Sequence, residues 1–273
     1  NIEGFLQYKN FSFIEHDVCD EIKINDKIDF ILHFASTASP VDYLNYPIKT
    51  LHIGSTGTDN VLNLGLKNNS VVLVASTSEI YGDPLEHPQA ESYYGNVNPI
   101  GPRGVYDEAK RFLEALTMAY KNKYKLNVRI ARIFNTYGPR MKVNDGRAIP
   151  NFINQAINDR NFTIYGDGLQ TRSFCYINDT IEAISLLLNS NYQLPLNIGN
   201  PNEYTIIELV KIIKNITSAQ SINLYEKLPE NDPKVRKPDI SKAKKILNWY
   251  PKTNLVEGLT ETIKYYKNLS NLN

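Results

Sequence analysis

The chain has 273 residues, of which 42% are hydrophobic and 22% charged, and its formal net charge is +1. These values are typical of a globular protein with one large domain, or with a main domain and a smaller one. The near-neutral charge argues against a nucleic-acid-binding surface. Two cysteines are too few for a disulfide framework, and the four histidines show no metal-ligand spacing. Since no apolar run is long enough to span a bilayer, we expect a cytoplasmic protein without nucleic-acid, membrane or metal partners.

Strands alternate with helices in the first half of the chain. Apolar runs predict strands at 11–17, 27–34, 71–75 and 127–134. A helix is predicted over 47–66, because Pro47 suits a first helical turn. A second helix is predicted from 106 to 123, where apolar residues recur at i, i+3, i+4 and i+7. This alternation predicts an α/β fold with a doubly wound parallel sheet over residues 1–140.

The pattern changes after about Pro139. Helices are predicted at 148–160, 179–190, 205–217, 239–249 and 255–268. Short strands are predicted between them at 162–166, 172–177, 194–198 and 221–226. Residues 141–273 therefore form a smaller mixed α/β region, from which a strand and a helix can return to the main sheet.

Tyr106 and Lys110 lie four residues apart and so share one face of a predicted helix. A lysine ammonium beside a phenol lowers the pKa of the tyrosine from about 10 towards working pH. Such a tyrosine can accept a proton from a sugar hydroxyl. The spacing alone is common on solvated helices, so it needs further context. Thr77 to Glu79 and Asn135 to Tyr137 each follow a predicted strand, and the carboxyl ends of parallel strands face one cleft.

A glycine-rich turn after a first strand would deliver a helix N-terminus to the pyrophosphate of a dinucleotide. The sequence does not contain one: the closest early pair, Gly54 and Gly57, lies inside a helical pattern. The chain also begins with Asn1. We therefore expect that the first strand–helix–strand unit of such a fold, about 30 residues, is absent from this chain.

Six blocks of sequence carry a resemblance to a known family. They are LHFASTASP (32–40), ASTSEIYG (75–82), GPRGVYDEAKR (101–111), RIFNTYGPR (132–140), NDGR (144–147) and TRSF (171–174). In this order they resemble the extended short-chain dehydrogenase/reductases, the NAD-dependent epimerases and dehydratases, and among these most closely the UDP-glucuronate decarboxylases. The resemblance covers essentially the whole chain. It implies a Rossmann-like domain at 1–140 that binds NAD, a region at 141–273 that binds a UDP-sugar, and a homodimer formed by helices 47–66 and 106–123.

The resemblance also implies a catalytic role for several residues. Tyr106 would remove the proton of the sugar 4-hydroxyl, and Lys110 would hold the nicotinamide ribose and lower the pKa of Tyr106. Thr77 would hydrogen-bond the same sugar oxygen. Oxidation at C4 makes the C6 carboxylate a β-keto acid, which loses carbon dioxide and leaves UDP-xylose after the hydride returns. NAD is therefore recycled.

Ser78 and Glu79 separate this reaction from related ones. The 4,6-dehydratases place Asp-Glu after the threonine, because an acid must protonate the departing C6 hydroxyl. Ser78 is a poor acid, whereas a decarboxylase needs no such proton. Glu79 is then a candidate proton donor or relay at C5, and the alternative is that it only caps the following turn.

The remaining implied contacts concern the two ligands. For the substrate, the resemblance places Asn135 at a phosphate, Tyr165 beside the uracil, and Arg172 and Arg236 at the diphosphate or the glucuronate carboxylate. For the cofactor, it places Asp17 and Val18 at the adenine, Phe34 and Ser36 near the pyrophosphate, and Thr136 and Arg147 around the nicotinamide. Gly54 stands where many members carry asparagine, which puts one cofactor-side contact in doubt.

Two other hypotheses remain open. One is a 4,6-dehydratase or a 4-epimerase that acts on a neutral sugar nucleotide. The other is a catalytically weak nucleotide-sugar-binding fragment, because without the glycine-rich loop the pyrophosphate loses its backbone donors. On that basis we expect weak or undetectable NAD binding by this chain.

Overall fold

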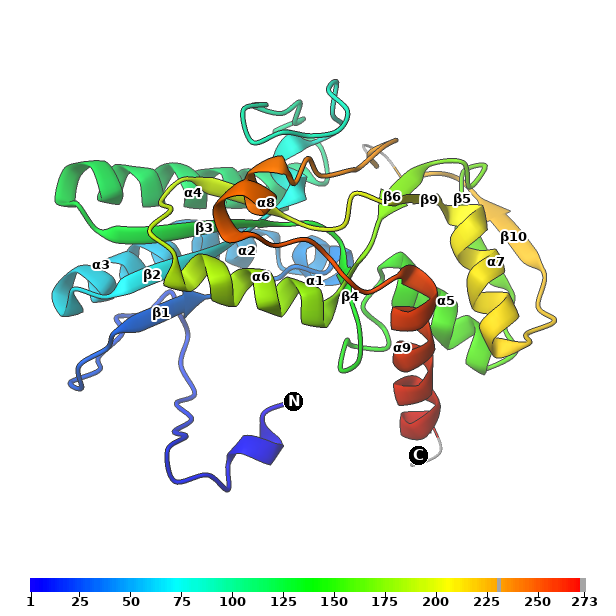
Figure 1. The fold of residues 1–273 in the computed structure, drawn as a ribbon, viewed down its shortest axis with the longest axis horizontal. Coiled ribbons are helices and arrows are strands. Elements are labelled where there is room, and N and C mark those ends of the chain that lie inside the picture. The colour runs from blue at the N-terminus through cyan, green and yellow to red at the C-terminus, as the bar shows by residue number, and fades with distance from the viewer. Residues whose placement is uncertain (230–231, 271–273) are drawn as a thin grey trace.

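The structure, a computed structural model, describes residues 1–229 and 232–270. Its centre is a parallel four-stranded sheet with the strand order β1–β2–β3–β8 (Figure 1). The strands are β1 (Phe30–His33), β2 (Val71–Thr77), β3 (Asn127–Ile133) and β8 (Pro195–Ile198). β2 and β3 are almost wholly buried, which agrees with their continuous apolar sequences. The predicted parallel α/β fold is confirmed.

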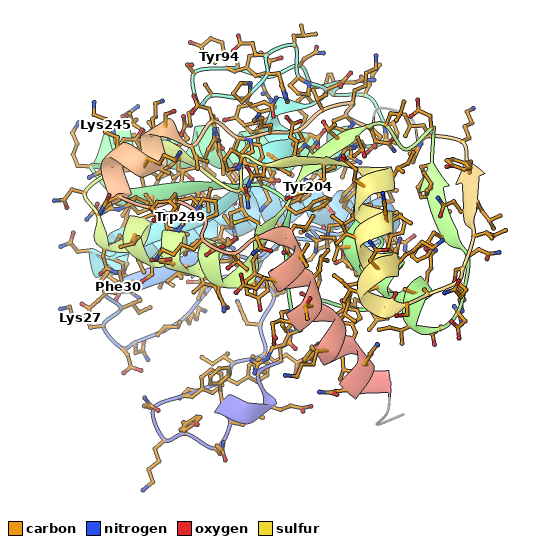
Figure 2. The ribbon with its side chains drawn as sticks, turned by 45° about the vertical axis from the view of Figure 1, so that its right-hand side comes forward. Lys27, Phe30, Tyr94, Tyr204, Lys245 and Trp249 are labelled. Atoms are coloured by element: carbon orange, nitrogen blue, oxygen red, sulfur yellow. The ribbon has the colours of Figure 1, made fainter. Side chains whose placement is uncertain are left out.

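Helices cover both faces of this sheet. On one face, α3 (Thr58–Asn68) and α4 (Gly104–Tyr124) share an apolar cluster with β2 and β3. On the other face, α6 (Ile177–Asn189) and α8 (Ser241–Leu247) pack with Trp249, a fully buried side chain that is labelled in Figure 2. This covering of both faces is what a doubly wound sheet requires.

The helix predicted over 47–66 is interrupted. It consists of α2 (Pro47–His52), a π-helical turn (Ile53–Gly57) and α3, and a short helix α1 (Pro40–Asn45) precedes it. Gly54 lies in the π-helical turn, where an added Cβ would come within 2.7 Å of the carbonyl oxygen of Ala109 on α4. Close packing against α4 therefore explains this glycine.

The strand predicted at 11–17 is wrong. This segment has no regular structure, and residues 12–17 are exposed. A strand needs a partner for its backbone groups, and β1 pairs only with β2 in the described part of the chain. The outer edge of β1 is correspondingly open: Phe30, labelled in Figure 2, is 48% exposed.

The second region packs around its own apolar cluster. It contains the helices α5 (Ala148–Ile157), α7 (Ile206–Thr217) and α9 (Leu255–Ser270). Short strand pairs complete it: β5 (Phe162–Tyr165) with β10 (Asn223–Glu226), β6 (Thr171–Ser173) with β9 (Glu203–Thr205), and β4 (Thr136–Tyr137) with β7 (Cys175–Tyr176). The single strand predicted at 172–177 is thus divided into β6 and β7, which pair with different partners. Within residues 1–229 and 232–270, no helix has the length and apolarity to cross a membrane.

Candidate active site

A cavity of about 590 Å³ lies at the carboxyl ends of β1, β2 and β3, where the second region meets the sheet. Its walls contain the ends of all three strands and residues of α4, α5, β5 and β6. Thirteen of the predicted site residues line it, namely Phe34, Ser36, Thr77, Ser78, Glu79, Tyr106, Lys110, Asn135, Thr136, Arg147, Tyr165, Arg172 and Arg236. Asp17 and Val18 do not.

Three of these side chains form the centre of the site. Tyr106 and Lys110 come from the first turns of α4, and both are buried. Thr77 ends β2 and is hydrogen-bonded to Tyr106. The Lys110 ammonium donates to the carbonyl oxygen of Ala75 at 2.7 Å and lies 5.8 Å from the centre of the Tyr106 ring. The tyrosine, the lysine and the threonine are thus brought together as the sequence predicted.

The pKa values of this centre differ from the expectation that Lys110 lowers the pKa of Tyr106. Burial raises the pKa of Tyr106 above its usual 10, and the nearby Glu79 carboxylate adds to the rise. The hydrogen bond with Thr77 offsets only part of this effect. Burial also lowers the pKa of Lys110 to about 8, against a smaller opposite effect of Glu114. Loss of solvation is therefore the largest influence on the pKa of both groups in this structure.

Tyr43 is a site residue that the sequence analysis missed. It lies on α1, is 2% exposed and stacks on the ring of Tyr106 with the centroids 5.2 Å apart and the planes at 11°. Stacking on one side restricts the orientation of the Tyr106 ring. The available signal was weak, because only the N-cap Ser39 before Pro40 marks this short helix.

A cluster of ion pairs forms another part of the cavity wall. The guanidinium of Arg236 donates two hydrogen bonds to the Glu79 carboxylate. Arg103 donates to the same carboxylate at 2.6 Å. Asp232 pairs with both Arg172, at 2.7 Å, and Arg103, at 3.5 Å. We call these five residues the arginine cluster.

The arginine cluster determines the charge of Glu79. Burial alone would raise its pKa, but the guanidinium groups of Arg236 and Arg103 outweigh burial and hold the pKa of Glu79 far below its usual value. Glu79 is therefore a carboxylate and lacks the proton that a donor at C5 must carry. It does not merely cap a turn, since Thr77 is the side chain that accepts from the Glu79 backbone N–H, at 3.2 Å.

Arg103 and Asp232 were not among the predicted site residues. Arg103 lies in the GPRGVYDEAKR block, so the resemblance pointed to its neighbourhood. Asp232 contacts Arg103 across 129 positions of sequence, and no local pattern signals such a contact.

The other predicted residues occupy the wall in different ways. Asn135 donates to the carbonyl oxygen of Ser173 at 3.4 Å. Arg147 is paired with Asp145. Ser78 is 2% exposed and so almost fully buried, whereas Tyr165 is 42% exposed at the cavity wall.

The two residues outside the cavity lie near α2 and α3. The exposed Asp17 carboxylate accepts a hydrogen bond from Lys49. Val18 packs at the edge of the cluster formed by α3 and α4, next to Gly57. Their contact with an adenine stays a prediction.

The chain combines a parallel sheet with Thr77, Tyr106 and Lys110 in one cavity. These features define a class of proteins, the extended short-chain dehydrogenase/reductases. The chain belongs to the family described as GDP-mannose 4,6 dehydratase, whose model matches residues 3–262.

Two relatives of known name are similar to this chain over most of its length. It is 46% identical over 267 residues to UDP-glucuronic acid decarboxylase 1 of Xenopus tropicalis, with 98% of this chain and 63% of the relative covered. It is 46% identical over 260 residues to UDP-glucuronic acid decarboxylase 3 of Arabidopsis thaliana, with 95% of this chain and 75% of the relative covered. The chain thus spans less than two thirds of the length of the first of these relatives.

A solved structure shows a similar fold. The UDP-glucuronic acid 4-epimerase from Bacillus cereus, in complex with UDP-glucuronic acid and NAD, has a TM-score of 0.84 and 26% sequence identity. The match covers 98% of this chain and 85% of the epimerase.

Proposed function

We propose that this chain carries the catalytic site of an NAD-dependent UDP-glucuronate decarboxylase, which forms UDP-xylose. The observation that carries the proposal is the buried Ser78 between Thr77 and Glu79 at the end of β2. A 4,6-dehydratase needs an acid there, and serine is too weak an acid to protonate a leaving hydroxyl. Relatives at about 46% identity that are named UDP-glucuronic acid decarboxylases support the same reaction.

The residues at the centre of the site fit NAD at its nicotinamide end. The buried Lys110 ammonium has three donors and uses one of them on the Ala75 carbonyl, so two remain for ribose hydroxyls. Phe34 and Ser36, which follow β1, line the same cavity and suit the pyrophosphate side. NAD, when bound, supplies the hydride acceptor and donor of the reaction.

Two side chains act on the 4-hydroxyl of the sugar in different ways. Tyr106 accepts the proton of the 4-hydroxyl, and Thr77 hydrogen-bonds the same oxygen and stabilises its charge. The resulting 4-keto sugar loses its C6 carboxylate as carbon dioxide, because the C4 ketone accepts the electron pair as an enolate. A proton from solvent then adds at C5 and restores the ketone, which is reduced again at C4. Tyr106 returns its proton to the C4 oxygen in the last step. Tyr106 can accept the first proton only as a phenolate, so its raised pKa in the structure opposes the abstraction and favours the return.

The arginine cluster is suited to the anionic substrate. Among residues 1–229 and 232–270, the carboxylates that pair with Arg103, Arg172 and Arg236 are those of Glu79 and Asp232. Fixed guanidinium groups bind carboxylates and phosphates through directed pairs of hydrogen bonds. We assign the glucuronate carboxylate or the diphosphate to this cluster, and Asn135 and Tyr165 to the nucleotide side.

We also propose a homodimer formed through α2 and α4. Both helices present large apolar side chains to solvent, among them Ile48, which is 64% exposed, and Phe112, which is 51% exposed. Such exposed apolar surface is typical of an interface.

Product analysis tests the proposed reaction. The protein is incubated with a large excess of NAD, which offsets its weak affinity, and with either UDP-glucuronate labelled at C6 or UDP-glucose. We expect labelled carbon dioxide and UDP-xylose from the first and no 4-keto-6-deoxy sugar from the second. UDP-galacturonate without carbon dioxide would instead identify a 4-epimerase.

Titrating NAD into the protein tests how well this chain holds the cofactor, which is where the decarboxylase and the nucleotide-sugar-binding fragment differ. We expect weak or undetectable affinity of this 273-residue chain for NAD. A dissociation constant in the micromolar range would refute that expectation.

A further inference from the structure

Glu114 is a buried acid on α4 that the mechanism above does not use. It lies one helical turn after Lys110 and is 8% exposed. Its Oε1 atom accepts a hydrogen bond from the hydroxyl of Ser76. Both of its oxygens also accept from the guanidinium of Arg132, at 3.0 Å from Nε and 2.8 Å from Nη2. An ion pair with two parallel hydrogen bonds fixes the orientation of the carboxylate.

The two partners of Glu114 come from neighbouring strands of the central sheet. Ser76 on β2 lies directly opposite Arg132 on β3 in the parallel ladder, and both side chains are buried. The Nη1 atom of Arg132 donates to the hydroxyl of Tyr81 at 2.9 Å and to the backbone carbonyl of Glu91 at 3.1 Å. One carboxylate on α4 thus holds the carboxyl ends of two strands through side chains that are themselves fixed.

The hydrogen bond of Ser76 lies next to the catalytic centre. Ser76 directly precedes Thr77, and both residues line the cavity with Tyr106. In the proposed reaction Thr77 and Tyr106 contact the same sugar oxygen, although Thr77 comes from β2 and Tyr106 from α4. A shift of β2 along α4 would therefore separate two groups that act on one atom. Displacements of about 1 Å can slow catalysis by about 100-fold.

Two polar contacts fasten the end of β2 to α4. The Lys110 ammonium donates to the backbone carbonyl of Ala75 at 2.7 Å. The next residue of the strand, Ser76, donates to Glu114. Because Lys110 and Glu114 are four residues apart, they lie on the same face of the helix. The contacts therefore join successive residues of the strand to successive turns of the helix, which defines the register of β2 against α4.

Stability alone is a poor explanation for burying these polar groups. Taking two charges out of water costs free energy that their attraction does little more than offset, so apolar residues can often replace a buried ion pair without loss of stability. The helix and the sheet already share an apolar cluster here. A role in placing Thr77 explains why a polar link is found at this point.

We propose that Glu114 and Ser76 are positioning residues: by joining α4 to the end of β2, they hold Thr77 and Tyr106 at the register in which both contact the 4-oxygen of the sugar. The inference rests on the proposed function, because that oxygen is a reacting atom of the decarboxylase. Arg132 serves this link by orienting the Glu114 carboxylate.

The test breaks the link from either side and measures carbon dioxide release from UDP-glucuronate, with kcat extrapolated to saturating NAD. Ser76→Ala removes the donor, and Glu114→Asp withdraws the acceptor by one methylene while keeping a charge opposite Arg132. We expect each variant to lower kcat by about 10- to 100-fold. The dissociation constant of UDP-glucuronate, measured by calorimetry without NAD, should stay within about twofold, because an interaction that only aligns the reacting groups affects kcat and not binding.

Thr117→Val is the matched control. Thr117 is a fully buried residue of the same helix, and its hydroxyl donates to the backbone carbonyl of Leu113 at 2.7 Å. The replacement removes a buried hydrogen bond but leaves the link between α4 and β2 in place. We expect Thr117→Val to lose stability in urea much as Ser76→Ala does, while its kcat stays within about twofold of the wild type.

A second background separates positioning from a general loss of stability. Ser76→Ala is introduced into Thr77→Val, which has already lost the hydroxyl that the link positions. In this background Ser76→Ala should lower kcat by less than about twofold, because the effects of residues that act through one contact are not additive.

Each outcome decides the inference. An unchanged kcat in Ser76→Ala or in Glu114→Asp overturns it. It is also overturned if Thr117→Val loses as much activity, or if Ser76→Ala has its full effect in the Thr77→Val background. If one of the two link variants does not fold, the other decides, and a failure of both assigns the link to the fold alone. All of these results leave the proposed function standing, whereas a wild-type chain that releases no carbon dioxide overturns the proposed function and this inference together.

Discussion

Replacing Asp107 with asparagine should change how the stability of the chain depends on pH. The carboxyl has a pKa of about 7 in the folded chain against 3.8 as its ordinary value. Between these two values the folded chain retains a proton that the unfolded chain has released. The free energy of unfolding therefore falls as the pH rises from about 4 to about 7, and above that range the loss is complete.

The magnitude follows from the size of the shift. A difference of about three pKa units at about 1.4 kcal/mol each gives about 4 kcal/mol. This cost applies to the wild-type chain at pH 8 and is absent at pH 4. In Asp107→Asn the group does not titrate, so the free energy of unfolding of the variant relative to the wild type should rise by about 4 kcal/mol between pH 4 and pH 8.

Urea denaturation at pH 4, 6 and 8, followed by circular dichroism, measures this difference. At any one pH, the difference in free energy of unfolding between the variant and the wild type also includes the effect of placing an amide in a buried site. This contribution is the same at all three pH values. A variant whose stability relative to the wild type stays constant within about 1 kcal/mol from pH 4 to pH 8 would refute the reasoning.

Three further predictions concern the site and its support. Tyr106→Phe should lower kcat by about 10²- to 10⁴-fold while the affinity for UDP-glucuronate, measured by calorimetry, stays within a few-fold; an unchanged kcat would contradict its role. Gly54→Asn should lower the free energy of unfolding in urea by roughly 1–3 kcal/mol, because an added Cβ meets α4 at 2.7 Å, whereas Gly4→Ala, with nothing within 4 Å, should have no effect. Arg236→Met should cost about 3–5 kcal/mol in the same assay, since it leaves a buried carboxylate with fewer partners. Adding Glu79→Gln should restore part of that loss, and a simple sum of the two single effects would contradict the coupling.

The elements with strong local patterns were predicted well. The apolar runs of β2 and β3 and the helical stripe of α4 are local features of sequence, and the structure confirms all three within a few residues. The strand at 11–17 failed because a strand depends on a partner as well as on its own composition. The pattern of apolar residues there could not reveal whether a partner was present.

In the candidate site, too, features with a local sequence pattern could be predicted and features that depend on distant residues could not. Tyr106, Lys110 and Thr77 could be predicted, because helical spacing and strand order determine where they meet. The ionised state of Glu79 could not, because it depends on Arg236, 157 positions away. The raised pKa of Tyr106 was missed for a related reason, since burial is a property of the whole fold.

The measurement that tests the central claim most directly is the incubation of the protein with UDP-glucuronate and a large excess of NAD in D₂O, followed by NMR of the product. Decarboxylation replaces the C6 carboxylate with a hydrogen from solvent at C5. We therefore predict UDP-xylose with one deuterium at C5, together with an equal amount of carbon dioxide. A six-carbon UDP-sugar without solvent deuterium would contradict decarboxylation and show that the site performs epimerisation instead.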